Sequence, residues 1–158
     1  LRPFLMREGV SDEEMKEART RDENWLEQVV ASLQGRSKTL VEMARSAKYF
    51  FHAPASYEKK VAEKFLTADM VPAFRSLTDR IRLLPRLDES SVERVMKATA
   101  EEHQLKLVDL AQPVRVALTG FTVSPSLYVV IPLLGAEAVV KRLERAIAFI
   151  SAESRAAT

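Results

Sequence analysis

The chain has 158 residues, 47% of them hydrophobic and 29% charged, which is enough for a buried core and for one or two small domains. It contains no cysteine, which excludes disulfides and thiolate metal sites, and its two histidines are too few to build a metal site unaided. The formal net charge of +2 is a weaker basic excess than expected of a protein that holds a long duplex through its phosphates.

No apolar run reaches the length of a membrane span, and no secretory signal opens the chain. We therefore expect a cytoplasmic protein whose partners include neither a membrane nor DNA. A domain that reads a few unstacked bases would not need a larger positive charge. The chain begins Leu1-Arg2-Pro3 without an initiator methionine, so we expect an excised fragment or a processed protein.

The composition favours helices along the whole chain. Leu, Ala, Glu, Lys, Arg and Met dominate, only 4 glycines occur, and β-branched alternation is rare. The predicted fold class is therefore all-α, with about eight helices. Some of the expected segments merge, and they cover roughly residues 1–8, 11–19, 22–34, 39–49, 57–66, 69–84, 90–103, 113–119, 125–134 and 136–151.

Four S/T-x-x-E boxes mark expected helix starts, because the hydroxyl caps one backbone N–H and the glutamate reaches back to another. The boxes are Ser11–Glu14, Thr20–Glu23, Thr39–Glu42 and Ser90–Glu93. Apolar residues three or four apart predict the buried faces of three helices. Those residues are Trp25, Val29, Val30 and Leu33; Leu40, Met43, Ala44, Ala47 and Phe51; and Val139, Val140, Leu143, Ile147 and Ile150.

The chain is expected to divide near Pro54. A proline removes a backbone donor and restricts the residue before it, and His52–Ser56 is the most linker-like segment. We predict two small helical subdomains, residues 1–54 and residues 55–158. A break at Pro85 is the competing boundary.

Arg36 is the first candidate for a functional residue. It follows Gly35, which is expected to end a helix in the left-handed conformation, and it precedes Thr39, the next expected cap. Arg36 should therefore lie on a short loop at the surface. The alternative is a solvated arginine that interacts with helix-end carbonyls.

Arg115 and the turn that follows it are the second and third candidates. Pro113 is expected in the first turn of a helix, which places Arg115 in that turn; the alternative is a surface arginine that supports the helix. Ser124 is expected to cap the next helix and Pro125 to occupy its first position. Pro132 lies inside the following apolar run, where it should kink the helix or split it into two short turns.

Other polar and aromatic residues indicate structure rather than chemistry. His103 is expected to interact with a helix end and to lack a positioned serine, cysteine or carboxylate partner, so no catalytic residue is assigned. Core packing is expected of Tyr49, Phe50 and Phe51, and the alternative is that they stack on a base. Solvated positions with some phosphate contact are expected of Arg75, Arg80, Arg82, Arg86 and Lys106.

Three stretches near the C-terminus form a series: A-Q-P-V-R-V-A-L-T-G over residues 111–120, S-P-S-L-Y over 124–128, and a tail with L-L-G and K-R-L-E-R-A. The series resembles the anticodon-binding end of bacterial glutamyl-tRNA synthetases. Those proteins carry Q-P-(L/V)-R-x-A-L-T-G, a (T/S)-P-G-(L/I)-F-like turn and a final helix with R-L-x-x-A. The string R-S-K-T-L-V-E-M-A-R-S-A-K-Y-F-F over residues 36–51 is similar to the family's R-x-x-T-(L)-x-E-x-x-x-x-A-x-Y-x-F.

The resemblance implies a domain that reads the anticodon of glutamate tRNA and rejects glutamine tRNA. Arg36 would read the third anticodon base and Arg115 the first or middle one, which requires the two side chains to converge on one concave face. A small pocket for a flipped base is implied at Ser124, Pro125 and Leu127. The family usually has glycine where this chain has Ser126, a difference expected to alter that pocket.

The family's catalytic half carries an H-I-G-H-like and a K-M-S-K-S-like signature, and this sequence has neither, nor a glycine-rich phosphate loop. The resemblance therefore implies no cofactor for this fragment, and ATP with magnesium for the parent ligase. The implied partners are the anticodon loop of glutamate tRNA and the catalytic domain of the same parent chain. The alternatives are a helical protein-interaction module, marked by an exposed apolar groove without a basic rim, and a tRNA-binding accessory subunit without its own enzyme.

Overall fold

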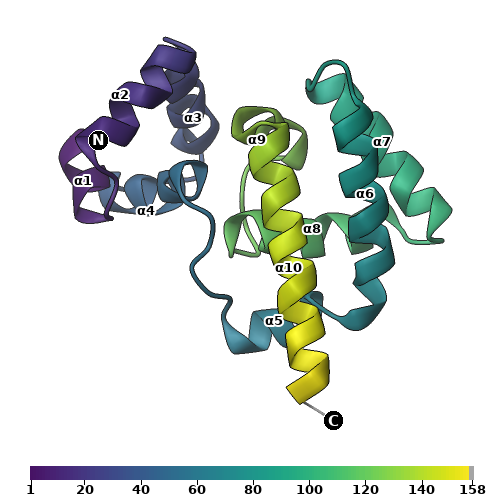
Figure 1. The fold of residues 1–158 in the computed structure, drawn as a ribbon. Helices are drawn as coiled ribbons and strands as arrows, with labels where there is room; N and C mark the ends of the chain where they lie inside the picture. Colours follow the sequence, from purple (N-terminus) through teal and green to yellow (C-terminus); the bar gives the residue numbers. More distant parts are fainter. Residues whose placement is uncertain (157–158) are drawn as a thin grey trace. The chain divides into compact units, whose positions relative to one another are not determined.

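The structure is a computed structural model that describes residues 1–156, in which ten α-helices and one 3-10 helix occur. No strand is found in this part of the chain, so the predicted all-α class is confirmed (Figure 1). The chain divides into two compact units, Leu1–Ala53 and Pro54–Thr158. Within the described range, no helix is both long and apolar enough to cross a membrane.

The first unit contains α1 (Arg2–Arg7), α2 (Asp12–Arg21), α3 (Trp25–Gln34) and α4 (Leu40–Phe51). Helix α4 packs against α1 and α3, and α2 packs against α3. The Trp25 ring meets Phe51 edge-on, with the ring centroids 5.2 Å apart. The buried core is formed by Leu5, Val10, Met15, Val29, Leu33, Ala44, Ala47, Tyr49 and Phe50.

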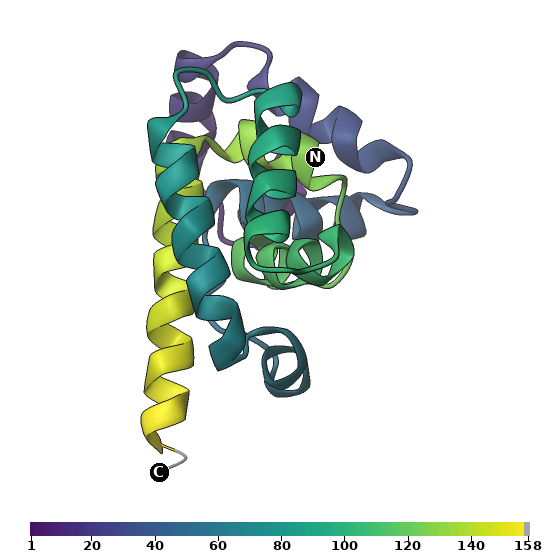
Figure 2. The ribbon, with the colours of Figure 1, turned by 90° about the vertical axis from the view of Figure 1, so that its right-hand side faces the viewer.

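The second unit contains α5 (Lys59–Phe65), the 3-10 helix η1 (Ala68–Met70), α6 (Val71–Leu83), α7 (Glu89–Glu102), α8 (Leu107–Thr119), α9 (Leu127–Leu134) and α10 (Ala136–Ala156). Helices α6 and α10 lie side by side along much of their length (Figures 1 and 2). Helix α7 packs against α6, α8 and α9, and α8 also packs against α10. The largest fully buried side chains here are Phe74, Leu77, Ile81, Met96, Leu110, Leu118, Ile131 and Leu143.

Two of the four predicted capping boxes begin helices. The Ser11 hydroxyl accepts from the Glu14 N–H at 3.2 Å, and the Ser11 N–H donates to the Glu14 carboxylate at 2.8 Å, so both bonds of the box form. The Thr39 hydroxyl accepts from the Glu42 N–H at 3.1 Å. The Glu42 carboxylate, however, accepts from the Lys38 N–H at 2.7 Å, one residue earlier than the box predicts.

The other two predicted boxes are wrong. Thr20 lies inside α2, where its hydroxyl donates to the Lys16 carbonyl at 2.9 Å, and α3 begins only after Asn24. Ser90 is the second residue of α7, because the Asp88 carboxylate already caps the helix by accepting from the Ser91 N–H at 2.8 Å. A carboxylate two residues upstream therefore displaces the hydroxyl as cap.

The predicted apolar face of α4 is wrong at its first residue. Leu40 is 48% exposed, and the next residue, Val41, is 44% exposed, so no element of the first unit covers this turn. Ala44 and Ala47 farther along the helix are buried as predicted. The spacing of apolar residues therefore identified the buried face of α4, but it did not show where the helices that pack against this face end.

Two helices contain prolines in their interiors. Helix α8 begins at Leu107, so Pro113 lies inside it and the predicted start at Pro113 is wrong. Helix α9 continues past Pro132 without splitting into two turns. Each proline removes one backbone bond to the carbonyl four residues earlier. Buried neighbours such as Leu110, Val114 and Ile131 supply the packing that keeps both helices formed despite the lost bond.

Candidate nucleic-acid interface

Arg36 lies on the loop between α3 and α4, at the surface, as expected. The predicted left-handed ending at Gly35 is wrong, since its φ is −75° and its ψ −7°. The chain instead closes a right-handed turn, in which the N–H groups of Arg36 and Ser37 both donate to the Leu33 carbonyl at 3.1 Å. Among the described residues the exposed Arg36 side chain has no hydrogen bond or ion pair, so its guanidinium is available to a ligand.

The surface next to Arg36 combines apolar and basic side chains. Leu40 and Val41 are exposed on the first turn of α4, and the exposed residues Lys38 and Arg45 lie before and after them in the sequence. Apolar contact with a base and cationic contact with a phosphate are both available on such a surface. We call this set of five residues, Arg36 included, the α4 corner.

Arg115 is the ninth residue of α8, so its predicted place in the first helical turn is wrong. The error follows from the helix starting at Leu107 instead of Pro113. The guanidinium is half-buried, and its Nε–H donates to the Ser124 hydroxyl at 2.8 Å. Its Nη1 also donates to the Gln112 side-chain oxygen. Two polar partners therefore orient the Arg115 side chain before any ligand arrives.

The turn before α9 is capped by Ser126, so the predicted cap at Ser124 with Pro125 in the first helical position is wrong. The Ser126 hydroxyl accepts from the Tyr128 N–H at 3.2 Å. The Ser124 hydroxyl instead donates to the Pro125 carbonyl at 2.7 Å while it accepts from Arg115. Ser126 has a φ of −50°, which any residue adopts, so the backbone here does not require the glycine usual in the family.

The structure brings Arg115 and Ser124 together, and it buries the other predicted members of the pocket. Ser124, Pro125 and Leu127 are all buried, Leu127 with 3% of its surface exposed. Ser126 is the exposed residue of the turn. A ligand at this turn would meet Ser126 and the Arg115 guanidinium first. Anticodon contact at Arg36, Arg115, Ser124, Pro125 and Leu127 stays a prediction.

Arg142 is a structurally important residue that sequence reasoning did not single out. Its side chain is 5% exposed, and its Nη1 donates to the Leu118 carbonyl at 2.8 Å, near the C-terminus of α8. Burial lowers the pKa of Arg142 to about 10, so the guanidinium is still charged at pH 7. The available signal was an arginine between Val140 and Leu143, within the apolar face of the last helix.

His103 has a serine partner, which contradicts the expectation that it would lack one. Its Nε2 lies 2.7 Å from the Ser76 hydroxyl on α6, and the Glu102 carboxylate approaches the same nitrogen at 3.9 Å. An orienting carboxylate in a nucleophilic triad would instead bond to Nδ1. Glu102 also forms an ion pair with Arg80 at 2.5 Å. The contacts therefore tie α6 to the end of α7, and no catalytic role is assigned.

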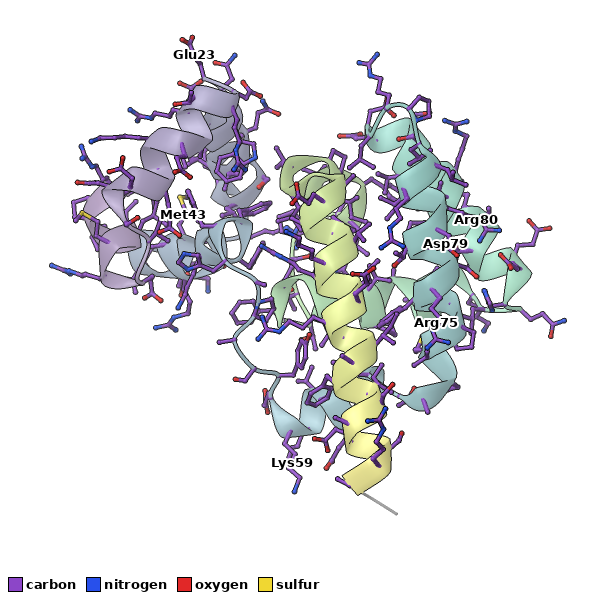
Figure 3. All side chains as sticks on the ribbon, viewed as in Figure 1. Glu23, Met43, Lys59, Arg75, Asp79 and Arg80 are labelled. Carbon is purple, nitrogen blue, oxygen red and sulfur yellow. The ribbon has the colours of Figure 1, made fainter. Side chains whose placement is uncertain are left out.

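The arginines of α6 and the following loop are mostly paired with carboxylates. Arg80 pairs with Glu102, Arg82 with Glu144, and Arg86 with Asp88. Arg75 is exposed on α6, where Figure 3 labels it together with Asp79 and Arg80. Because of these ion pairs, fewer arginines of α6 and the following loop are left without a carboxylate partner than the sequence suggested.

Comparisons with known proteins agree on one family. A family model described as an anticodon binding domain matches residues 1–147. The glutamate–tRNA ligase of Thermodesulfovibrio yellowstonii is 37% identical over 147 residues, which are 93% of this chain and 31% of that protein. Glutamate–tRNA ligase 2 of Coxiella burnetii is 45% identical over 125 residues, which are 79% of this chain and 27% of that protein.

Solved structures show the same fold. The crystal structure of a glutamate–tRNA ligase from Elizabethkingia meningosepticum matches 95% of this chain and 28% of its own, with a TM-score of 0.74 at 22% sequence identity. The chain thus spans less than a third of the length of these curated relatives and of this solved structure.

Proposed function

Because this chain belongs to the anticodon-binding domain family, and its relatives are glutamate–tRNA ligases, we propose that it selects glutamate tRNA over glutamine tRNA by reading the anticodon. The observation that carries this proposal is the exposed Arg36 guanidinium on the α4 corner, without a hydrogen bond or ion pair within residues 1–156. Arg115, held by Ser124 and Gln112, is the second proposed reader.

The chemistry of the third anticodon base explains why an arginine discriminates. This base is cytosine in glutamate tRNAs and guanine in glutamine tRNAs. On its pairing edge an unstacked cytosine presents two acceptors, O2 and N3, and one donor, N4–H, whereas guanine presents two donors, N1–H and N2–H, and one acceptor, O6. A guanidinium has only donors. Arg36 would thus bind cytosine and face donors with donors at guanine, so one side chain attracts the right tRNA and repels the wrong one.

The chemical steps of aminoacylation would take place in the rest of the parent protein. Glutamate activation with ATP and magnesium would take place in a catalytic domain of the same chain, in the cytoplasm. In the part of the chain that the structure describes, no group of three or more His, Asp or Glu side chains could hold a metal ion. Correct anticodon contacts would help to seat the distant acceptor end, which raises specificity through transition-state binding.

The basic residues of the α4 corner favour RNA over a protein as its ligand. Lys38 and Arg45 flank the exposed Leu40 and Val41 in the sequence, whereas an apolar groove for a protein partner would lack a basic rim. The proposal also requires that Arg36 and Arg115 reach nucleotides of the same hairpin loop.

The test is a binding titration of the chain with anticodon stem-loops of glutamate tRNA that carry either cytosine or guanine as the third anticodon base. We expect Arg36→Gln to narrow the difference in binding free energy between the two stem-loops by about 1–3 kcal/mol, the scale of one good base contact. Arg45→Gln is the matched control, because it removes an exposed arginine from the same unit. It should leave that difference unchanged.

The outcome that overturns the assignment is an equal loss of affinity for both stem-loops in Arg36→Gln, since this would mean that Arg36 only neutralises phosphate. Failure of the unaltered chain to prefer the cytosine stem-loop would remove the selectivity proposal altogether.

A further inference from the structure

The charges of the first unit are divided between two parts of its sequence. Residues 1–35, which include α1, α2 and α3, carry five arginines or lysines and eight aspartates or glutamates. Residues 36–53, which include α4, carry four and one. The basic excess of this unit is therefore confined to α4 and the loop before it, a division that the net charge of the whole chain, +2, does not show.

Three basic side chains of this segment, besides that of Arg36, have no hydrogen bond or ion pair within residues 1–156. They are Lys38, on the loop before α4, and Arg45 and Lys48, on the helix itself. Lys38 and Arg45 are exposed, and Lys48 is partly exposed. We call these three residues the α4 basic patch. Cations that no carboxylate neutralises are available to an anionic ligand, which displaces their small counterions on binding.

Arg45 and Lys48 lie on the same side of α4. At about 100° per residue, a separation of three residues leaves the two side chains about 60° apart around the helix axis. Val41, four residues before Arg45, is 44% exposed on this side, whereas Ala44 and Ala47 are buried in the core. The side of α4 that faces away from the core therefore carries two cations, and Lys38 adds a third just before the first turn.

The rest of the first unit repels an anionic ligand. Four exposed glutamates of α2, α3 and the turn between them have no ion pair in the part of the chain that the structure describes. They are Glu13, Glu17, Glu23 and Glu27, of which Figure 3 labels Glu23. An anion that approached this unit would thus be repelled from α2 and α3 and attracted to α4, so the charge distribution would orient its encounter.

The ligand that best fits this surface is the phosphate backbone of RNA. Its phosphates form a row of negative charges that cations along one helix can neutralise whatever the sequence of the bases. Arg36, the proposed reader of a base, lies at the start of the same segment. The nucleotides next to that base would bring their phosphates to the adjoining surface, which α4 supplies.

We propose that the α4 basic patch binds the phosphate backbone of the tRNA beside the nucleotide that Arg36 reads. This inference rests on the proposed function and deepens it by adding three contact residues with a different task. Arg36 contacts the edge of a base, whereas Lys38, Arg45 and Lys48 contact phosphates. Because every nucleotide carries the same phosphate, the patch holds the cytosine and guanine stem-loops equally well.

The experiment measures the affinity of the chain for both stem-loops over a range of salt concentrations. The slope of log affinity against log salt concentration reports the number of phosphates that the protein neutralises. Lys38→Gln, Arg45→Gln and Lys48→Gln should each reduce the magnitude of this slope by about 0.7–0.9, the value for one phosphate contact. Each should weaken binding of the two stem-loops by the same factor.

The matched control is Arg19→Gln, which removes an exposed arginine from α2 in the same unit. It changes the net charge as much as Arg45→Gln does, and it should leave the slope unchanged. Circular dichroism should find the thermal unfolding midpoints of all these variants close to that of the unaltered chain, because the replaced side chains lie at the surface.

Glu42→Gln tests the patch in the opposite direction. Glu42 is the acidic residue of residues 36–53, and its carboxylate accepts from the Lys38 N–H at 2.7 Å, a bond that the amide oxygen of glutamine can still accept. Loss of this negative charge should strengthen binding of both stem-loops. A variant that only loosened the fold would weaken binding, so the sign of the change separates the two effects.

The results that would overturn this inference differ from those that would overturn the proposed function. If the three variants leave the slope unchanged while Arg36→Gln narrows the preference for cytosine, the patch does not bind phosphate and an acidic protein becomes its expected partner, but base selection stands. A loss of slope in Arg19→Gln as large as in Arg45→Gln would also refute the patch. If the slopes fall as expected but the unaltered chain does not prefer the cytosine stem-loop, the patch stands and base selection is refuted.

Discussion

The two units present their candidate arginines in opposite ways. Arg36 in the first unit is exposed on a loop, without a hydrogen bond or ion pair from its side chain among the described residues. Arg115 in the second unit is half-buried in a helix and bonded to Ser124 and Gln112. An exposed arginine must lose rotamer freedom when it binds, whereas a held arginine has lost that freedom on folding. We therefore expect Arg115 of the second unit to supply more of the affinity for RNA and Arg36 of the first unit more of the discrimination between bases.

The units also differ in what fixes the backbone behind each arginine. The loop of Arg36 is closed by two N–H groups that donate to the Leu33 carbonyl. Helix α8, which carries Arg115, is tied near its end to α10 by the buried Arg142. The position of Arg115 therefore depends on tertiary packing, and that of Arg36 on local backbone bonds.

The largest effect is expected from Arg142→Ala, which tests whether tertiary packing holds helix α8, and with it Arg115, in position. The change leaves the Leu118 carbonyl without its donor and empties a buried volume, so the second unit should lose about 2–4 kcal/mol of unfolding free energy. Arg142→Met is the matched variant, because it keeps much of the packing and should lose less.

The single tryptophan, Trp25, packs with Phe50 and Phe51 in the first unit. Its fluorescence therefore reports the unfolding of the first unit separately from that of the second. In denaturant titrations of Arg142→Ala, the helical signal of circular dichroism should shift to lower denaturant, while the Trp25 fluorescence transition should stay in place. An equal shift of both signals would show that the two units unfold together, and it would contradict the expectation that Arg142 stabilises the second unit alone.

The next largest effect is expected from Arg115→Ala in stem-loop binding. Loss of a pre-oriented guanidinium should weaken binding of the cytosine stem-loop by about 1–3 kcal/mol. Arg36→Ala should weaken it by less, because part of what Arg36 gains on binding is spent in ordering its side chain. Isothermal titration of both variants measures this, and a greater loss in Arg36→Ala than in Arg115→Ala would reverse the assignment.

The smallest effect is expected from Ser124→Ala, which removes one of the two partners of Arg115 and makes it more like Arg36. Binding should weaken by about 0.5–1.5 kcal/mol, the net worth of one hydrogen bond. In the double variant Ser124→Ala with Arg115→Ala, the serine change should add nothing further, because it acts only through the arginine. Additive losses would instead mean that Ser124 contacts RNA itself, as the family resemblance implied.

The success of sequence reasoning differed between neighbouring elements for identifiable reasons. The helical class and the caps at Ser11 and Thr39 were predicted, because propensity and capping act over a few residues. The start of α8 was predicted six residues late, because proline was assumed to open a helix and the buried side chains that hold Pro113 inside it could not be seen. The cap before α9 was placed at Ser124 instead of Ser126, because Pro125 was assumed to occupy the first helical position.

The sequence by itself determined the all-α class, the position of Arg36 on an exposed loop and, through its motifs, the family of the chain. Those properties depend on short-range preferences and on residue identity, which are written along the chain. Tertiary structure alone decided that Ser124 faces Arg115 and that Arg142 caps the end of α8. These contacts join residues 9 and 24 positions apart, so they exist only once packing has brought the helices together.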